Sequence, residues 1–252
     1  MSFIIHRKPP YRVFVEEGPS GAMAHVAELP GCFAVGSDAS KSVAGVPRAI
    51  VAFLAWLRSH REPLVPEALV ARPSMADLYV AEVFSEGAPL QAGSRAALFE
   101  PDTTAWTDEK LERTLRWLSY SRADLLSQVE GMSEAELKAI RLEEDRTLWD
   151  TLLHVANAEY GYVNRIAGPL SEKEGVTPTE PADARQRLAL VRNILQRRVT
   201  EITPDRRVEV VYAPWAARPD EPWTLQKALR RALEHEREHV FEIGNYTSRT
   251  NS

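Results

Sequence analysis

Cysteine is nearly absent from this chain, since Cys32 is the only one among 252 residues. An internal disulfide is therefore excluded, which fits a reducing compartment. Long apolar runs are missing too, and the longest, residues 49–57, is too short to cross a bilayer. The N-terminal residues lack the apolar centre and small-residue cleavage site of a signal peptide. We therefore expect a cytoplasmic protein without a membrane partner.

An excess of positive charge is also missing. The chain has 31 Lys and Arg residues against 36 Asp and Glu residues, and both parts on either side of Glu100 carry an acidic excess. Proteins that bind nucleic acid normally present a net basic domain or stripe. We therefore expect no nucleic-acid partner.

Arginines do crowd one stretch, residues 185–198, where they spread around the outer faces of a predicted helix. We interpret this stretch as a solvated face. The residues concerned are Arg185, Arg187, Arg192, Arg197 and Arg198. Arg122 interrupts the apolar stripe of another predicted helix. It either reaches into a pocket to hold an anionic group or extends along the surface to the bundle end, and we favour the second interpretation.

Residues 1–100 combine short β-prone runs with one helical run, and we predict an α+β domain with a small antiparallel sheet backed by a helix. The apolar residues between Val43 and His60 recur at helical spacing. The predicted strands are residues 11–16, 22–29, 32–36 and 77–84, with residues 96–99 as a further candidate.

From Pro101 the pattern changes, because strand-like alternation nearly vanishes and long amphipathic helices take over. We therefore place a domain boundary here, with residues 1–100 before it and residues 101–252 after it. The helices are predicted over residues 107–129, 147–166, 182–202 and 224–246, with a linker over residues 168–181 and an extended insert over residues 207–212. Four such helices predict an all-α four-helix bundle, and bundles of this kind place cofactor sites between facing helices.

Two histidines in the last predicted helix, His235 and His239, are four residues apart. This spacing puts both imidazoles on one helix face, about 6 Å apart at their Cβ atoms. The same face carries Ala228, Ala232 and Ile243, so it is expected to look toward the bundle interior. Two nitrogens so placed are able to converge on one metal ion.

A third histidine, His154, lies in the middle of another predicted helix, between Leu153 and Val155. An isolated pair of histidines at this spacing is more often a surface feature than a metal site. Three histidines at positions inside a bundle strengthen the case, so we predict a divalent transition-metal site formed by His154, His235 and His239. Three protein ligands leave open positions, which is typical of catalytic metal sites. No catalytic residue is assigned.

The segment from His235 to His239 also spells H-E-x-x-H, the zinc-peptidase motif, in which Glu236 would activate a water. Only thirteen residues follow His239, and they include no histidine that could complete such a site. We therefore rank a peptidase as an unfavoured alternative. Glu236 is interpreted as a solvated residue or as a group outside the ligand shell.

The segments LWDTLLHVANAEYGYV and WTLQKALRRALEHEREHVFEI resemble the DinB-like family of four-helix-bundle metalloproteins. The matching features are His154 with Glu159, and the pattern His235, His239, Glu242, Ile243. The resemblance implies a site for zinc, nickel or iron, frequent dimerisation, and thiol-dependent transferase or hydrolase-like chemistry. We accordingly expect zinc or nickel, an unknown small-molecule substrate and a homo-oligomer. Glu242 stands where Gln is common in the family.

The run AHVAELPGCFAVGSDASKSVAG, within residues 11–63, resembles the HicB-like antitoxin family. Domains of that family bind a small toxin partner, which implies a binding or oligomerising role for the first domain. Two functions therefore stay open. In the first, the bundle is a metal-dependent transferase or hydrolase. In the second, the HicB-like domain makes the important contact and the bundle is a metal-stabilised scaffold.

Overall fold

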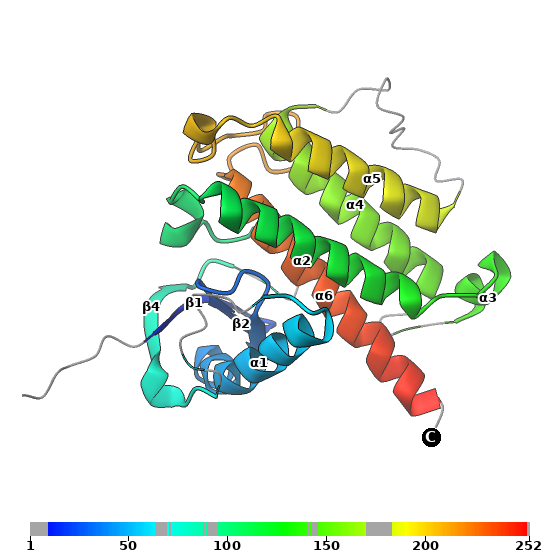
Figure 1. The fold of residues 1–252 in the computed structure, drawn as a ribbon, viewed down its shortest axis with the longest axis horizontal. Coiled ribbons are helices and arrows are strands. Elements are labelled where there is room, and N and C mark those ends of the chain that lie inside the picture. The colour runs from blue at the N-terminus through cyan, green and yellow to red at the C-terminus, as the bar shows by residue number, and fades with distance from the viewer. Residues whose placement is uncertain are drawn as a thin grey trace, which may run out of the picture. The chain divides into compact units, whose positions relative to one another are not determined.

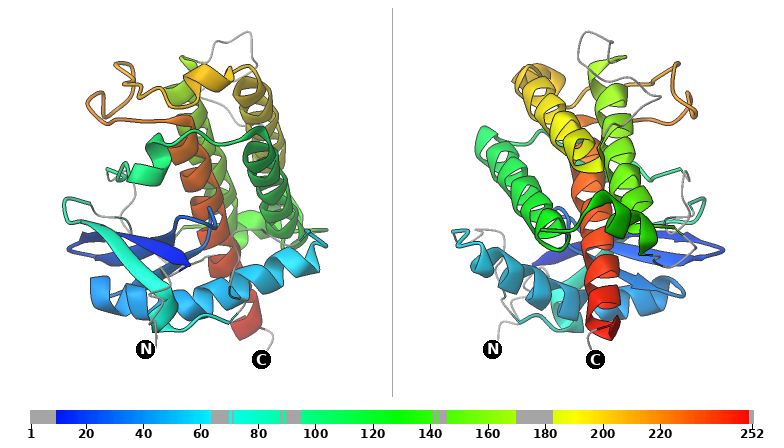
Figure 2. Two further views of the ribbon diagram at one scale, coloured as in Figure 1. Left: turned by 60° about the vertical axis from the view of Figure 1, so that its left-hand side comes forward. Right: turned by 90° about the vertical axis from the view of Figure 1, so that its right-hand side faces the viewer.

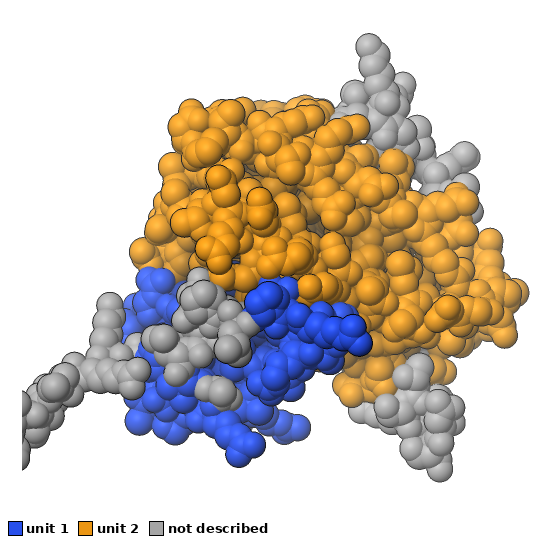
Figure 3. Space-filling view, in the orientation of Figure 1, with its two compact units in different colours: residues 1–99 blue, residues 100–252 orange. Residues whose placement is uncertain are grey.

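The computed structural model describes residues 10–63, 70, 72–87, 89, 95–140, 142, 146–169 and 183–250. The chain folds as two compact units, Met1–Phe99 and Glu100–Ser252, which are coloured separately in Figure 3. His6 and most of the predicted linker lie outside the described residues.

The first unit contains a four-stranded sheet in the order β3-β2-β1-β4. Its strands are β1 (Tyr11–Gly18), β2 (Gly21–Val26), β3 (Phe33–Gly36) and β4 (Leu78–Phe84). The first three strands pair antiparallel, as predicted, whereas β4 pairs parallel to β1. The sheet is therefore mixed, and the purely antiparallel prediction is wrong for the β1–β4 pair. The chain reaches β4 through a long crossover that includes a helix, and such crossovers join parallel strands.

The helix of this crossover is α1 (Ala39–Ser59), which packs against β1, β2 and β3. It begins four residues before the predicted start, because the Asp38 side chain accepts a hydrogen bond from the Lys41 backbone N–H at 2.8 Å and caps the helix. In the described part of the chain, α1 alone is long and apolar enough to cross a membrane, but it has the buried face of a core helix.

Two further predictions for the first unit have different outcomes. The α+β class is confirmed, and β4 follows a short 3-10 turn, Met75–Asp77. Residues 96–99, a candidate strand, form no strand. Instead, the Ala97 backbone N–H donates to Glu16 Oε1 at 3.2 Å, and Phe99 packs against Phe14.

The second unit is helical, and its four long helices run side by side (Figures 1 and 2). They are α2 (Asp108–Ser127), α4 (Leu148–Ala167), α5 (Ala184–Thr200) and α6 (Leu225–Thr250), with the short α3 (Glu134–Ala139) between α2 and α4. Short 3-10 turns occupy Glu100–Thr103 and Pro204–Arg206. The predicted all-α bundle is confirmed. In place of the extended insert there is one isolated bridge, Val211 to Trp223.

The helix starts follow local capping chemistry. Thr107 and Thr147 accept hydrogen bonds from backbone N–H groups in the first turns of α2 and α4. Ser133 and Glu136 form a reciprocal capping box at α3. At the other end of α4, Gly168 adopts a φ of 86°, which favours glycine and ends the helix as predicted.

The packing that brings α4 and α6 together also positions the site. α4 contacts both α5 and α6, and α2 contacts α6. The apolar core on this side contains Leu152, Val155 and Ala156 from α4 and Ile243 from α6, all buried. The first half of α4 therefore shares an apolar core with the C-terminal half of α6.

Candidate metal centre

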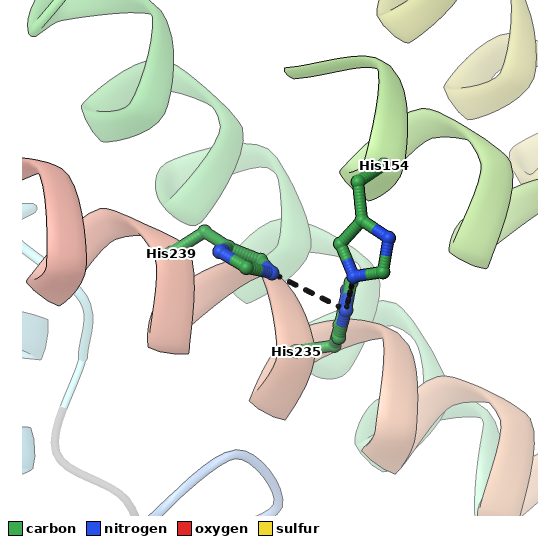
Figure 4. Close-up of side chains that lie close together, drawn as sticks. All are labelled: His154, His235 and His239. Atoms are coloured by element: carbon green, nitrogen blue, oxygen red, sulfur yellow. Dashed lines mark hydrogen bonds between the residues drawn. The ribbon is translucent and has the colours of Figure 1, made fainter. Parts of the chain in front are cut away.

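The three predicted ligands come from these two helices. His235 and His239 lie one turn apart on α6, on the face that also buries Ala228, Ala232 and Ile243. His154 projects from the facing side of α4 toward them (Figure 4). The structure therefore brings together the three histidines that the sequence singled out.

The Nε2 atoms of these residues form a compact group with His235 in the middle. His235 Nε2 lies 2.9 Å from His154 Nε2 and 3.3 Å from His239 Nε2. One nitrogen from each residue lies within 4.8 Å of the others. Two nitrogens that each bind one ion at about 2.1 Å are about 3.0–3.4 Å apart at octahedral or tetrahedral angles. The two distances from His235 Nε2 fit a shared divalent ion.

Glu242, one turn after His239, fixes the orientation of that ligand. His239 Nδ1 lies 2.6 Å from Glu242 Oε2. An ionised carboxylate only accepts hydrogen bonds, so Nδ1 carries the proton and Nε2 keeps its lone pair for a metal. A carboxylate behind a ligating histidine is a common arrangement in metal sites. Glu242 lies where it could perform this role, at a position where the family pattern favours Gln.

The environment keeps His154 and His235 neutral. Burial, reinforced by electrostatic interaction with His239 and Arg146, lowers the pKa of His154 to about 4. Burial also holds the pKa of His235 well below its usual range, and His239, His154 and Arg231 act in the same direction. Neutral imidazoles are the form that binds metal. His239 is buried, whereas His154 and His235 are half-buried, so the group lies at an edge that solvent reaches.

Tyr162, which the sequence did not single out, lies beside His235, and Trp223 packs on Tyr162. The Tyr162 ring stands edge-on to His235 with centroids 6.5 Å apart, and its centroid lies 5.4 Å from that of Trp223. Burial raises the pKa of the Tyr162 phenol, so it stays neutral at neutral pH. In the sequence these residues look like ordinary core aromatics.

Arg122 behaves differently from the favoured prediction. It does not extend along the surface, because its side chain is buried and pairs with Glu159 and Glu236. Glu236 is buried too, so the interpretation of it as a solvated residue is wrong. Burial raises the pKa of Glu236, but Arg192 and Arg122 outweigh that effect and hold the pKa below its usual value.

The arginine-rich face of α5 is only partly solvated. Arg197 is exposed, as predicted, but Arg187 and Arg192 are buried. Arg192 pairs with Glu159 and Glu236, and Arg187 lies over the Tyr160 ring. Helical periodicity assigns such residues to the solvent side because it ranks residues by polarity alone. It has no information about partners on other helices.

Comparison with known proteins places the bundle in a family. The model of the DinB superfamily matches residues 117–243, which run from α2 into α6. A solved structure of YfiT from Bacillus subtilis, described as a probable metal-dependent hydrolase with an unusual four-helix bundle topology, is similar with a TM-score of 0.45. The two chains are 19% identical over 62% of this chain and 94% of that one. No curated protein matches this chain.

Proposed function

This chain belongs to the DinB superfamily, and on that basis we propose that its second unit binds one divalent transition-metal ion through His154, His235 and His239. The observation that supports this proposal most directly is the approach of three Nε2 atoms, at 2.9 and 3.3 Å from the central one. The bracing of His239 by Glu242 adds to it. Zinc and nickel are the proposed ions, since imidazole nitrogen suits both.

We propose that the site is catalytic and serves a transferase or hydrolase reaction. A divalent ion held by these three histidines would keep open positions and would supply Lewis-acid chemistry there, for a substrate oxygen, a thiol or a water. The chain's own residues would keep His154 and His235 neutral and orient His239 through Glu242. The Tyr162 ring would line one side of the site.

The peptidase alternative finds no support in the geometry. A general base for water must be within hydrogen-bond reach of that water. Both carboxylate oxygens of Glu236 instead accept hydrogen bonds from arginines. We therefore propose no peptidase activity, and casein-type substrates should survive incubation with the protein.

Partner binding by the first unit stays a prediction from the HicB-like resemblance. One observation favours it: the edge strand β4 exposes Tyr79, Val80 and Val83, with exposed fractions of 50%, 41% and 47%. Apolar edge strands are sites where another chain is able to add. Co-purification of a small partner protein that a Val83→Lys substitution abolishes would support this function, and loss of metal would not affect it.

Metal analysis of untagged protein tests the main proposal. After dialysis against zinc or nickel, the wild type should hold about one ion per chain, and alanine at any of the three histidines should largely remove it. His60→Ala is the matched control, since His60 packs on Trp56 in the first unit. A wild type that stays metal-free would overturn the proposal. If the wild type binds metal, turnover of thiol-linked or ester substrates by the metal-loaded protein, and not by protein treated with a chelator, would identify the reaction class.

A further inference from the structure

Four charged side chains meet inside the bundle, one from each long helix. They are Arg122 on α2, Glu159 on α4, Arg192 on α5 and Glu236 on α6, and we call them the charge cluster. Their exposed fractions are 7%, 3%, 6% and 1% in that order. The cluster has no net charge, so each buried charge has an opposite partner. Burial of this kind is tolerated only when the groups are paired and hydrogen-bonded.

Both arginines bridge both carboxylates. Arg122 donates from Nε to Glu236 at 2.6 Å and from Nη2 to Glu159 at 2.5 Å. Arg192 donates from Nε to Glu159 at 2.5 Å and from Nη2 to Glu236 at 3.1 Å. Each carboxylate is therefore held by two arginines from two different helices.

Each arginine also donates a hydrogen bond to the backbone of the helix that carries the other arginine. Arg122 Nη1 donates to the Leu188 carbonyl oxygen of α5 at 2.5 Å. Arg192 Nη1 donates to the Leu118 carbonyl oxygen of α2 at 2.5 Å. The contacts therefore close a ring around all four helices. Planar guanidinium groups in such a ring permit little rotation or sliding of the attached helices, because their donors have a fixed geometry.

The two carboxylates lie on the two helices that carry the metal ligands. Glu236 directly follows His235 and comes three residues before His239, and Glu159 comes five residues after His154. Apolar packing between α4 and α6 favours contact but is non-directional. The charge cluster adds the directional restraint that apolar packing lacks.

We infer that Glu159 and Glu236 are positioning residues, which set the rotation and spacing of α4 against α6 so that the three imidazole nitrogens converge. The glutamate of the H-E-x-x-H sequence therefore acts through the helix pairing and never contacts the reacting atoms. This inference rests on the proposed metal site for its functional meaning. The charge cluster itself is a feature of the chain that is measurable without metal.

The test compares two isosteric substitutions that flank His235. Glu236→Gln removes a carboxylate of the charge cluster. Glu234→Gln removes an equally buried carboxylate that pairs with Arg230 and Arg231 of α6 itself. Co²⁺ affinity is measured by competition with a chelator, together with the visible absorption spectrum of the bound ion and chemical denaturation.

The expected result is a loss of Co²⁺ affinity of about 10–100-fold for Glu236→Gln, with a changed spectrum, and about threefold or less for Glu234→Gln. Glu159→Gln, on α4, should cause the same loss of Co²⁺ affinity as Glu236→Gln. It replaces Glu236→Gln in the test if that variant does not fold. Equal losses for Glu234→Gln and Glu236→Gln at equal stability would overturn the inference, because the effect would then follow from any lost buried charge.

A metal-free measurement separates this inference from the proposed function. Proton NMR of the metal-free wild type should show close contacts between the His154 and His235 rings, whose centroids lie 4.8 Å apart. The contacts should weaken in Glu236→Gln and persist in Glu234→Gln. If the wild type binds no ion, the proposed function fails while this measurement still decides the inference. Ring contacts that are unchanged in Glu236→Gln would overturn it.

Discussion

Two long amphipathic helices, α1 in the first unit and α6 in the second, bury very different faces. The buried face of α1 is apolar apart from Ser42 and includes Val46, Ile50 and Phe53. The buried residues of α6 include charged side chains throughout its first half, from Lys227 to Arg237. An apolar face needs only a surface to pack on, whereas a charged face needs specific partners.

The difference separates packing that stabilises a unit from packing that orients helices. The α1 side chains stabilise the first unit by removing apolar area from water. The buried charges of α6 contribute little net stability, because desolvation offsets the attraction between partners. They instead specify which helices pair and in which orientation. Directional pairing of this kind is what a three-histidine site requires.

The largest expected effect is a loss of stability from a substitution in α1 that leaves the metal content unchanged. Phe53→Ala removes a side chain that is 1% exposed on α1 and should lower the free energy of unfolding by about 3–5 kcal/mol. Metal content per folded chain should not change. Val51→Ala, at an exposed position of the same helix, should cost less than about 0.5 kcal/mol in the same denaturation experiment. Equal costs at the two positions would contradict the assignment of the buried face.

A smaller effect is expected at the residue that orients His239. Glu242→Gln preserves the size of the side chain but removes the charge that holds the Nδ1 proton. Metal affinity should fall by about 10–100-fold, or about 1.4–2.7 kcal/mol, with little change in the stability of the metal-free protein. Glu134→Gln, an exposed change on α3, should leave the affinity unaltered. Calorimetric titration with zinc measures both, and an unchanged affinity in Glu242→Gln would show that Glu242 does not support the ligand.

The smallest effect concerns pH. The pKa of His154 is about 4 in the folded chain, below the ordinary value of 6.5, so between these values the unfolded chain binds more protons. The contribution of His154 to the stability of the metal-free protein should therefore be complete above about pH 6.5 and be lost as the pH falls toward 4. Because His154 is half-buried, we expect a contribution of about 1 kcal/mol. In His154→Gln the loss of unfolding free energy between pH 6.5 and 4 should be smaller than in the wild type. Urea titrations that give the same pH dependence for both proteins would contradict the low pKa of His154.

The sequence predicted most of what local interactions control. The caps at Thr107 and Thr147 depend on hydrogen bonds within three residues, so the starts of α2 and α4 follow from the chain itself. The spacing of His235 and His239 places both on one helix face for the same reason. The approach of His154 was also predictable in outline, because its apolar neighbours mark a helix face that turns inward.

Contacts between distant parts of the chain decided the rest. Arg122 meets Glu236 across 114 positions of sequence, and Arg192 meets Glu159 across 33. Polarity and periodicity led us to place Arg192 and Glu236 in water and left Arg122 on an apolar stripe without a partner. Only packing of the helices supplies the partners that make burial favourable. The pairing of β4 with β1 is likewise a contact between distant segments, since any strand that returns through a crossover must find its neighbour in the folded sheet. Local chemistry thus determined the elements and the histidine spacing, and tertiary structure determined which charges are buried and how they hold the ligands.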